Sequence, residues 1–227
     1  MNAFIKKYIP SRWHYRISQY KKQFFGYTTY SQFGEDQVLL LLCKDIDRGR
    51  YVDVGAFDPY RYSNTFLLYK RGWSGVNIDP NPEAIKRFKK KRPHDQNICS
   101  GVGNEGILTY YQFSDPAVNT FVAAEAEKWM NKTFLTFLGT TEIPVRPLSQ
   151  LISGVIDVLT IDTEGMDLQV LESYDWKEIP KIIVIEGNNS EPFLRSKGYV
   201  LYAKKGISFI YLHKKYSVSN SETQELE

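Results

Sequence analysis

The sequence predicts a doubly wound α/β domain whose central sheet has seven mostly parallel strands. Three observations support this prediction: short apolar runs alternate with amphipathic segments, several of the runs end in an acidic residue, and glycines follow two of the strand ends. At 227 residues, 42% of them hydrophobic and 24% charged, the chain has the size and composition of one globular domain. Ligands of such sheets bind beyond the carboxyl ends of the strands, so we expect the functional residues there.

The alternation can be followed along the chain. Acidic residues at 35–36 precede the apolar run 38–42, as at a helix N-terminus. The expected strands of the sheet then cover residues 51–54, 76–79, 96–99, 155–161, 181–185, 199–203 and 207–213, and an additional alternating strand covers 107–113. The expected helices cover residues 62–71, 81–91, 166–173 and 190–197. The last two strands are expected to pair as a hairpin that turns at Lys205-Gly206.

The ends of the chain differ from this domain. Residues 1–30 predict a basic, aromatic, helical N-terminal extension, because residues 1–34 contain six lysines and arginines and no acid. We expect the extension to pack on its own domain or on a partner subunit, or to be a peripheral contact with an anionic membrane surface at the inner face. The domain itself is expected at 31–215 with an insertion at 115–140, followed by a disordered tail at 216–227.

Composition excludes several other classes of protein. No uncharged apolar run approaches the roughly 18 residues that span a bilayer, and no signal peptide begins the chain, so a cytoplasmic protein is expected. The two cysteines, Cys43 and Cys99, fit no metal-binding or redox spacing and are expected to be buried free thiols. No nucleic-acid partner is expected, because the chain has a net charge of +3 and residues 1–34 contribute +6.

The strongest local motif is the run YVDVGAF at residues 51–57. A strand that ends in Asp53-x-Gly55 lets the backbone turn sharply and approach a ligand closely. The next strand ends in Asp79, 24 residues after Gly55, where a carboxylate can accept both hydroxyls of a ribose. Together these residues favour a cofactor that contains adenosine.

The turn after this strand distinguishes between such cofactors. A dinucleotide needs the spacing G-x-G-x-x-G, but Gly55 is followed by Ala56, Phe57 and Asp58, which are bulky or acidic. S-adenosylmethionine has no phosphate and carries a sulfonium cation, which nearby carboxylates tolerate. The sequence therefore favours S-adenosylmethionine over NAD.

Further acids follow the later strands. Asp162 and Glu164 come directly after the apolar strand that ends at Ile161, and Glu186 ends the next strand. Neighbouring carboxylates are costly unless they meet a cation, a proton or solvent. These acids are therefore candidates for the reaction chemistry.

Several motifs in this order resemble the FkbM family of methyltransferases: SQFGED at 31–36, YVDVGAFDP at 51–59, SNT at 63–65, GWSGVNIDPNP at 72–82 and IDVLTIDTEG at 156–165. The resemblance covers residues 31–213. It implies a Rossmann-like class I methyltransferase fold, S-adenosylmethionine as cofactor, and O-methylation of sugars or polyketide-like hydroxyls. It also implies which residues bind the cofactor: Gln32, Glu35, Asp53, Gly55, Ala56, Asp79, Pro80, Asn81, Ser100, Gly101 and Asp162.

Methyl transfer is an in-line displacement, so the enzyme mainly aligns the reactants and removes the hydroxyl proton. Asp162 is the first candidate for the general base, with Glu186 and Glu164 as further catalytic candidates. An alternative is a Mg²⁺ site formed by Asp162, Glu186 and Asn188, which would bind a sugar diol.

The expected acceptor is a sugar or a glycan, including a lipid-linked polysaccharide. Two rival functions remain open: an NAD-dependent sugar oxidoreductase or epimerase, and a non-catalytic binding module with a methyltransferase fold. The first is disfavoured by the missing glycines. The second is disfavoured by the intact acids at 53, 79, 162 and 186.

Overall fold

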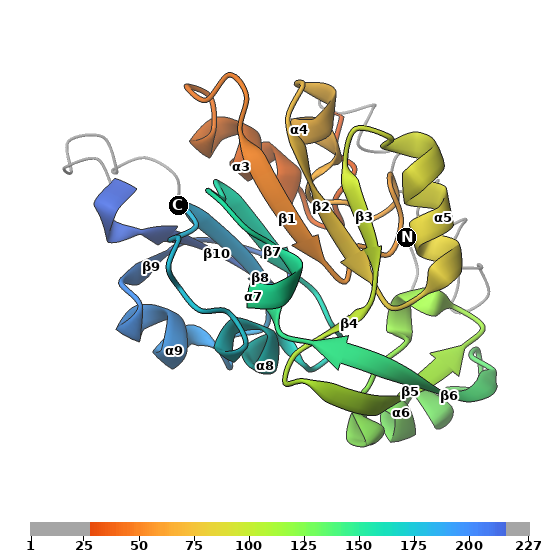
Figure 1. Ribbon diagram of the computed structural model, residues 1–227. Coiled ribbons are helices and arrows are strands. Elements are labelled where there is room, and N and C mark those ends of the chain that lie inside the picture. The colour runs from red at the N-terminus through yellow and green to blue at the C-terminus, as the bar shows by residue number, and fades with distance from the viewer. Residues whose placement is uncertain (1–27, 217–227) are drawn as a thin grey trace, which may run out of the picture.

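The computed structural model describes residues 28–216, and its core is a twisted seven-stranded sheet (Figure 1). The strand order is β3-β2-β1-β7-β8-β10-β9. The strands are β1 (Arg50–Val54), β2 (Ser74–Asp79), β3 (Gln96–Cys99), β7 (Val158–Ile161), β8 (Ile182–Glu186), β9 (Tyr199–Lys205) and β10 (Ser208–His213). β10 runs antiparallel to β8 and β9, whereas the pairs from β3 through to β8 are parallel. The predicted fold class is therefore confirmed.

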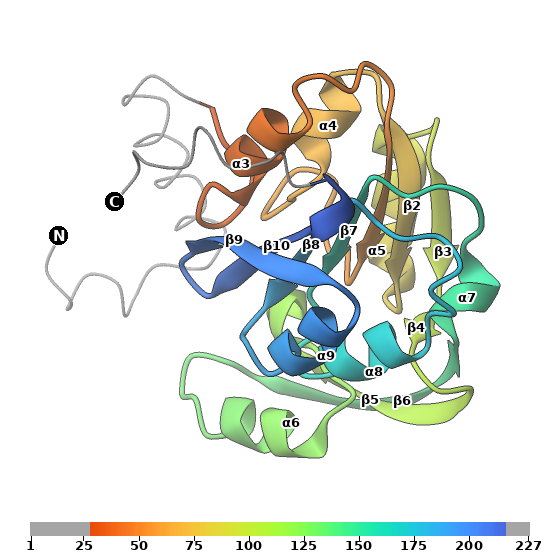
Figure 2. The same cartoon turned by 90° about the vertical axis from the view of Figure 1, so that its left-hand side faces the viewer.

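Helices cover both faces of this sheet (Figures 1 and 2). Strand residues alternate between the faces, so Val52 packs in one core cluster and Tyr51 in the other. The Tyr51 face is covered by α3 (Glu35–Leu42) and α4 (Phe66–Lys70), and the Val52 face by α7 (Leu148–Leu151), α8 (Asp167–Glu172) and α9 (Glu191–Ser196). α5 (Pro82–Lys91) packs against β2 and β3.

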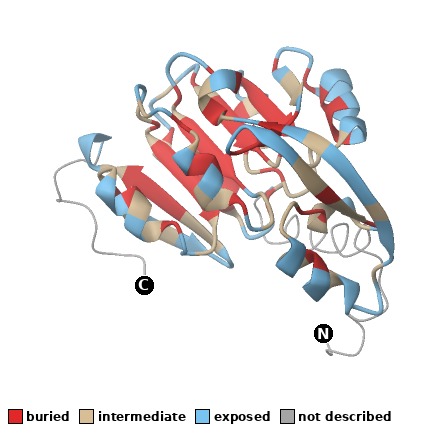
Figure 3. Cartoon of the chain, turned by 60° about the horizontal axis from the view of Figure 1, so that its bottom comes forward, coloured by how far each residue is buried: buried red, intermediate tan, exposed pale blue. Residues whose placement is uncertain are grey.

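A smaller sheet stands beside the carboxyl end of the large one. It consists of β4 (Gly101–Val102), β5 (Gly106–Phe113) and β6 (Phe137–Arg146), in the order β4-β6-β5. The short helix η1 (Pro116–Val118) and α6 (Ala123–Met130) connect β5 to β6. Figure 3 shows that the large sheet is buried while much of the β5–β6 pair is exposed. β6 was not predicted; it begins inside the expected insertion 115–140 and most of it is exposed.

Several predictions need correction or fall outside the described residues. β7 begins at Val158 and not at Val155, whose side chain is 63% exposed. Both cysteines are free, but only Cys43 is buried; Cys99 is exposed. The helical extension and the tail fall largely on residues 1–27 and 217–227, outside the described part of the chain. None of the helices within residues 28–216 has the length and apolar character that crossing a membrane requires.

The turns after β1 and β7 touch at Gly55. This glycine has a φ of 75°, and a Cβ atom on it would lie 1.7 Å from the carbonyl oxygen of Asp162. The Asp162 N–H donates to the carbonyl of Val54 over 3.0 Å, which holds the two turns together. Only glycine allows both the backbone conformation and the contact. The carboxyl ends of the two central strands therefore meet at one point.

We expect Gly55→Ala to destabilise the fold more than Gly72→Ala does. Both glycines have a positive φ, so each substitution should cost about 1–2 kcal/mol of backbone strain. A Cβ on Gly72 would meet nothing within 4 Å, whereas one on Gly55 would overlap Asp162. The steric overlap should add at least about 2 kcal/mol to the loss of unfolding free energy. Denaturant melts of both variants measure this difference, and equal losses would contradict the contact.

Candidate active site

A cavity of about 340 Å³ lies at the carboxyl ends of β1, β2, β7 and β8. Its opposite wall comes from the loop 57–64 and from residues 110–129. Among the described residues, that cavity is lined by six carboxylate side chains and one guanidinium: Asp53, Asp79, Asp115, Asp162, Glu164, Glu186 and Arg61. So marked an excess of negative charge favours a cationic ligand.

Most of the predicted site residues line this cavity: Gln32, Asp53, Gly55, Ala56, Asp79, Pro80, Ser100, Gly101, Asp162, Glu164 and Glu186. Glu35, Asn81 and Asn188 are not among the lining residues. The strand ends thus assemble one site from segments more than 100 residues apart in sequence.

Asp79, at the end of β2, is held by backbone hydrogen bonds. Its Oδ2 accepts the N–H of Phe57 over 2.8 Å, and its Oδ1 accepts the N–H of Asn81 over 2.8 Å. Burial raises the pKa of Asp79 to about 6, although both hydrogen bonds oppose the shift. Each carboxylate oxygen keeps a second lone pair for a ligand hydroxyl.

Asp53 lies inside β1, and its carboxylate is buried. Oδ1 accepts the hydroxyl of Thr160 on β7, and Oδ2 accepts the hydroxyl of Thr65, each over 2.6 Å. Burial raises the pKa of Asp53, and the two threonine hydroxyls counteract this effect. The carboxylate is therefore fixed in one orientation at the edge of the cavity.

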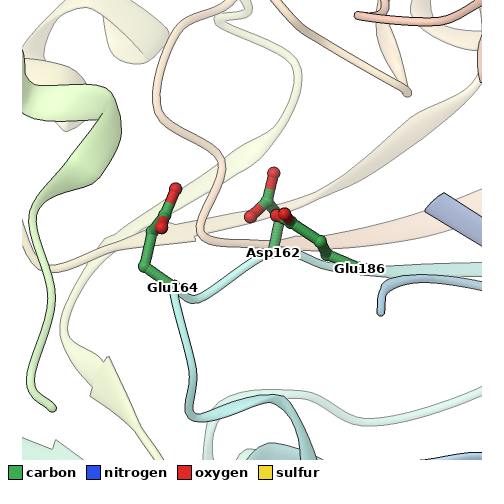
Figure 4. Close-up of side chains that lie close together, drawn as sticks. All are labelled: Asp162, Glu164 and Glu186. Atoms are coloured by element: carbon green, nitrogen blue, oxygen red, sulfur yellow. The ribbon is translucent and has the colours of Figure 1, made fainter. Parts of the chain in front are cut away.

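Asp162, Glu164 and Glu186 form an acid cluster, with carboxylate oxygens within 4.8 Å of one another (Figure 4). Asp162 is exposed to the cavity, but the surrounding protein and the two glutamates raise its pKa well above its usual range. Carboxylates this close to one another repel when all are ionised, so the cluster favours a bound proton or a cation. Burial and Glu186 raise the pKa of Glu164 to about 8. The cluster can therefore store a proton near neutral pH.

The backbone of Glu164 is held in an unusual conformation. Its φ of 51° is in the left-handed region that non-glycine residues rarely adopt. The buried Thr120 hydroxyl donates to the Glu164 carbonyl over 2.8 Å, which links the segment before α6 to the turn after β7. Nearby, Asp167 accepts the N–H and the hydroxyl of Thr163, and burial raises its pKa to about 6. These contacts hold the turn that carries Glu164 in place.

The SQFGED segment has a structural role at the start of α3. Asp36 accepts the hydroxyls of Thr29 and Ser31 and the N–H of Tyr30. Glu35 accepts the N–H of Phe33 over 2.7 Å and the hydroxyl of Ser208 over 2.8 Å, so it ties α3 to β10. Of the two cofactor residues expected in this segment, only Gln32 lines the cavity.

The local structure around Asn81 and Asn188 explains why these two residues do not line the cavity. The side chain of Asn81 accepts the N–H of Glu83 over 3.0 Å and caps α5. Asn188 is exposed, beyond the positive φ of Gly187, and its carbonyl accepts the N–H of Glu191. The acid cluster accordingly contains Glu164 and not Asn188.

Sequence reasoning missed the aromatic part of the cavity wall. It includes Tyr110 and Phe121, whose rings lie 4.7 Å apart, and Trp129 of α6. Arg61 lies over the rings of Phe57 and Tyr62, with its carbon Cζ 5.2 and 4.7 Å from their centroids. Arg61 also pairs with Asp115 over 3.4 Å. The only sequence signal was the high aromatic content of this region.

Two donors in this wall lack a partner. The Nε of Arg61 and the Nε1 of Trp129 are buried and have no hydrogen-bond partner within the described residues. Unsatisfied buried donors are uncommon in folded proteins and are often completed by a ligand or water. Arg61 and Trp129 both line the part of the cavity that the core strands do not form.

The turn after β1 offers no phosphate site. The N–H of Phe57 is bound by Asp79, and the N–H groups of Tyr60 and Arg61 are bound by Asp58 Oδ1 over 3.0 Å each. A dinucleotide would need such N–H groups for its pyrophosphate. Carboxylates already occupy them here, in agreement with the missing glycine motif.

The fold and the site together define an α/β domain whose acidic cavity, at the carboxyl ends of the strands, favours a cationic ligand. The chain belongs to the FkbM methyltransferase family, because the family model described as the Methyltransferase FkbM domain matches residues 53–204, more than half of the chain. None of the curated proteins compared with the chain matches it.

Solved structures of methyltransferases are also similar. The methyltransferase FkbM from Methylobacillus flagellatus is 14% identical with a TM-score of 0.45, and the match covers 74% of this chain and 44% of that protein. The chain therefore spans less than half of that protein's length. A TehB-like SAM-dependent methyltransferase from Corynebacterium glutamicum is 14% identical with a TM-score of 0.40, covering 88% and 97%. A methyltransferase from Geobacter sulfurreducens is 13% identical with a TM-score of 0.41, covering 92% and 94%.

We expect Glu164→Gln to stabilise the cofactor-free protein at alkaline pH. The raised pKa means that the protonated Glu164 favours the folded state below its ordinary pKa of 4.5, and that this contribution is lost as the pH rises through about 8. Glutamine keeps the shape without the charge. At about pH 9 the melting temperature should rise by about 3 °C or more, and at about pH 5 by much less.

The exposed Glu172, at the end of α8, provides the matched control for this substitution. Glu172→Gln should change the melting temperature little at either pH. If Glu164→Gln raises the melting temperature over the parent no more at pH 9 than at pH 5, the charge of Glu164 does not destabilise the folded protein.

Proposed function

We propose that this protein is an S-adenosylmethionine-dependent O-methyltransferase that acts on a hydroxyl of a sugar or glycan. The observation that carries the proposal is the wall of six carboxylates and one guanidinium around a cavity without a phosphate site. Such a wall attracts a sulfonium cation and repels a pyrophosphate. Membership of the FkbM methyltransferase family supports the same reaction.

The residues of the strand ends fit this cofactor. The remaining lone pairs of Asp79 can accept the two ribose hydroxyls, and Gly55 and Ala56 let the backbone approach the ligand closely. Ser100 and Gly101, after β3, lie beside Asp79 and can contact the adenine edge; the N–H of Ser100 donates to the Asp79 carbonyl over 3.2 Å. When bound, the cofactor supplies an electrophilic methyl group.

The aromatic wall supports a sugar acceptor. Aromatic rings bind the apolar faces of sugars, and the unpartnered Arg61 Nε and Trp129 Nε1 can donate to sugar oxygens. An anionic acceptor is disfavoured, because the single guanidinium is already paired with Asp115. The acceptor hydroxyl would lie between this wall and the acid cluster.

The acid cluster provides a route for the hydroxyl proton. As the oxygen–carbon bond forms and the carbon–sulfur bond breaks, the hydroxyl proton must leave. A carboxylate whose pKa is raised toward neutrality accepts a proton efficiently at neutral pH. Asp162 is the proposed base, and the carboxylates of Glu186 and Glu164 lie beside it. A cation bound beside the cluster lowers these pKa values, so that Asp162 is ionised when it is needed.

A metal-assisted version uses the same acids. Asp162, Glu164 and Glu186 have oxygen atoms close enough to hold a divalent cation, which would bind a sugar diol and lower its pKa. In this version Glu164 takes the place expected for Asn188. We favour the metal-free version, because the raised pKa of Asp162 lets a proton take the place of a cation in the cluster.

Calorimetric titration tests the cofactor. The protein should bind S-adenosylmethionine and its demethylated product and should not bind NAD. Asp79→Asn keeps an acceptor for one loop N–H but loses a charge, so it should weaken cofactor binding by about 10- to 100-fold, the usual range for hydrogen bonds to a charged group. Binding of NAD alone would end the proposal, and unchanged affinity in the variant would remove the ribose role of Asp79.

Asp162→Asn tests the base. We expect this variant to keep most of its cofactor affinity and to lose about 10²-fold or more in turnover, the usual effect of a lost acid–base group. Methyl transfer from labelled cofactor to a panel of glycosides measures turnover. In the metal-free version a chelator has no effect; in the metal version the chelator and Glu186→Gln reproduce the defect. Parental turnover of Asp162→Asn would contradict both versions.

A further inference from the structure

A buried arginine lies beneath the loop that forms part of the cavity wall. Arg92, at the end of α5, is 0% exposed. Its Nη2 donates to the carbonyl of Pro59 over 2.5 Å and to the hydroxyl of Ser63 over 2.7 Å, and its Nη1 donates to the hydroxyl of Thr65 over 2.8 Å. One guanidinium therefore holds both ends of the loop that carries Arg61.

A chain of hydrogen bonds also connects Arg92 to Asp53. Thr65 accepts from Arg92 and donates its hydroxyl proton to Asp53 Oδ2 over 2.6 Å, so a two-step hydrogen-bond chain runs from the guanidinium to the carboxylate. On the other side, Asp95 accepts the hydroxyl of Tyr51 over 2.5 Å and the amide of Asn77 over 2.9 Å. Both of these groups also lie within 3.4 Å of Arg92.

Two carboxylates compensate the buried charge of Arg92. A buried cation needs such partners, and Arg92 stands between Asp53 and Asp95. Asp95 faces the interior network, whereas Asp53 lines the cavity, where a cationic ligand can reach it.

Thr65 does not cap the helix whose first position it precedes. It is the N-cap residue of α4, where a threonine side chain normally accepts a backbone N–H of the first turn. Its side chain makes no capping hydrogen bond and is used between Arg92 and Asp53 instead. Giving up the cap usually costs about 1 kcal/mol, which implies another use for the hydroxyl.

We propose that Arg92 and Thr65 are positioning residues that couple the loop 59–65 to the Asp53 carboxylate. Through Thr65, Arg92 fixes the orientation of Asp53 on the cofactor side of the cavity. Through Pro59 and Ser63, it holds the loop that carries Arg61 on the acceptor side. This inference rests on the proposed function for its effect on binding, but the coupling itself does not.

Thr65→Val tests the proposal more safely than a change at Arg92, which would leave several buried groups unpaired. Valine keeps the shape and removes the hydroxyl. We expect S-adenosylmethionine, added to the whole protein in a calorimeter, to bind about 10-fold more weakly, the scale of a lost hydrogen bond to a charged group. In the cofactor-free protein, amide hydrogen exchange within residues 60–65 should become faster.

Two further variants separate positioning from general stability. Thr65→Ser restores the hydroxyl and should return both affinity and exchange to within about twofold of the parent. Thr109→Val removes a similar hydrogen bond, from a threonine hydroxyl to Glu142 over 2.7 Å on the small sheet, and should change neither quantity.

The inference is overturned if Thr65→Val binds the cofactor like the parent, or if its loop exchanges at the parental rate. It is also overturned if Thr65→Ser is as defective as Thr65→Val, since the methyl group and not the hydroxyl would then matter. Should the parent itself not bind S-adenosylmethionine, the proposed function fails, and the hydrogen-exchange comparison still decides whether Thr65 couples the loop.

Discussion

The contact between the turns at Gly55 and Asp162 is the constraint on which the site depends. Because a Cβ at position 55 would lie 1.7 Å from the Asp162 carbonyl, the two central strands can end at the same level only with glycine there. Asp53 precedes this contact on β1, and Asp162 forms its other side. Asp79 reaches the same turn through the Phe57 N–H. One steric requirement thus brings carboxylates from three strands to a common edge.

This convergence brings like charges close together, and each carboxylate is stabilised in a different way. Asp53 is stabilised by two hydroxyls and a distant guanidinium, and Asp79 by two backbone N–H groups. No ion pair among the described residues involves Asp162 or Glu186, and burial and the neighbouring glutamates raise the pKa of Asp162. The acids nearest the β7 and β8 ends are therefore the least compensated, and a cationic ligand has most to contribute there.

The sequence predicted the strand ends because burial and acidity coincide there, but it could not predict how side chains turn beyond them. Glu35 was expected at the cofactor and instead bonds Phe33 and Ser208, a contact across 173 residues that no local pattern encodes. β6 was missed because it is mostly exposed and contains Pro144, which normally argues against a strand. Pro144 is tolerated in β6 because β4 pairs only with Val145 and Arg146, beyond the proline.

The features that the sequence predicted and those that it did not lie on different sides of the cavity. The cofactor side is built by the large sheet, whose strand ends are constrained by packing on two faces. The aromatic side is built by residues 110–129 and the loop 57–64, which are joined to the core by contacts such as the Thr120 hydroxyl on the Glu164 carbonyl and Arg92 beneath the loop. Gly55 fixes the carboxylate edge, whereas these contacts fix the aromatic wall, so different residues position the two sides of the cavity.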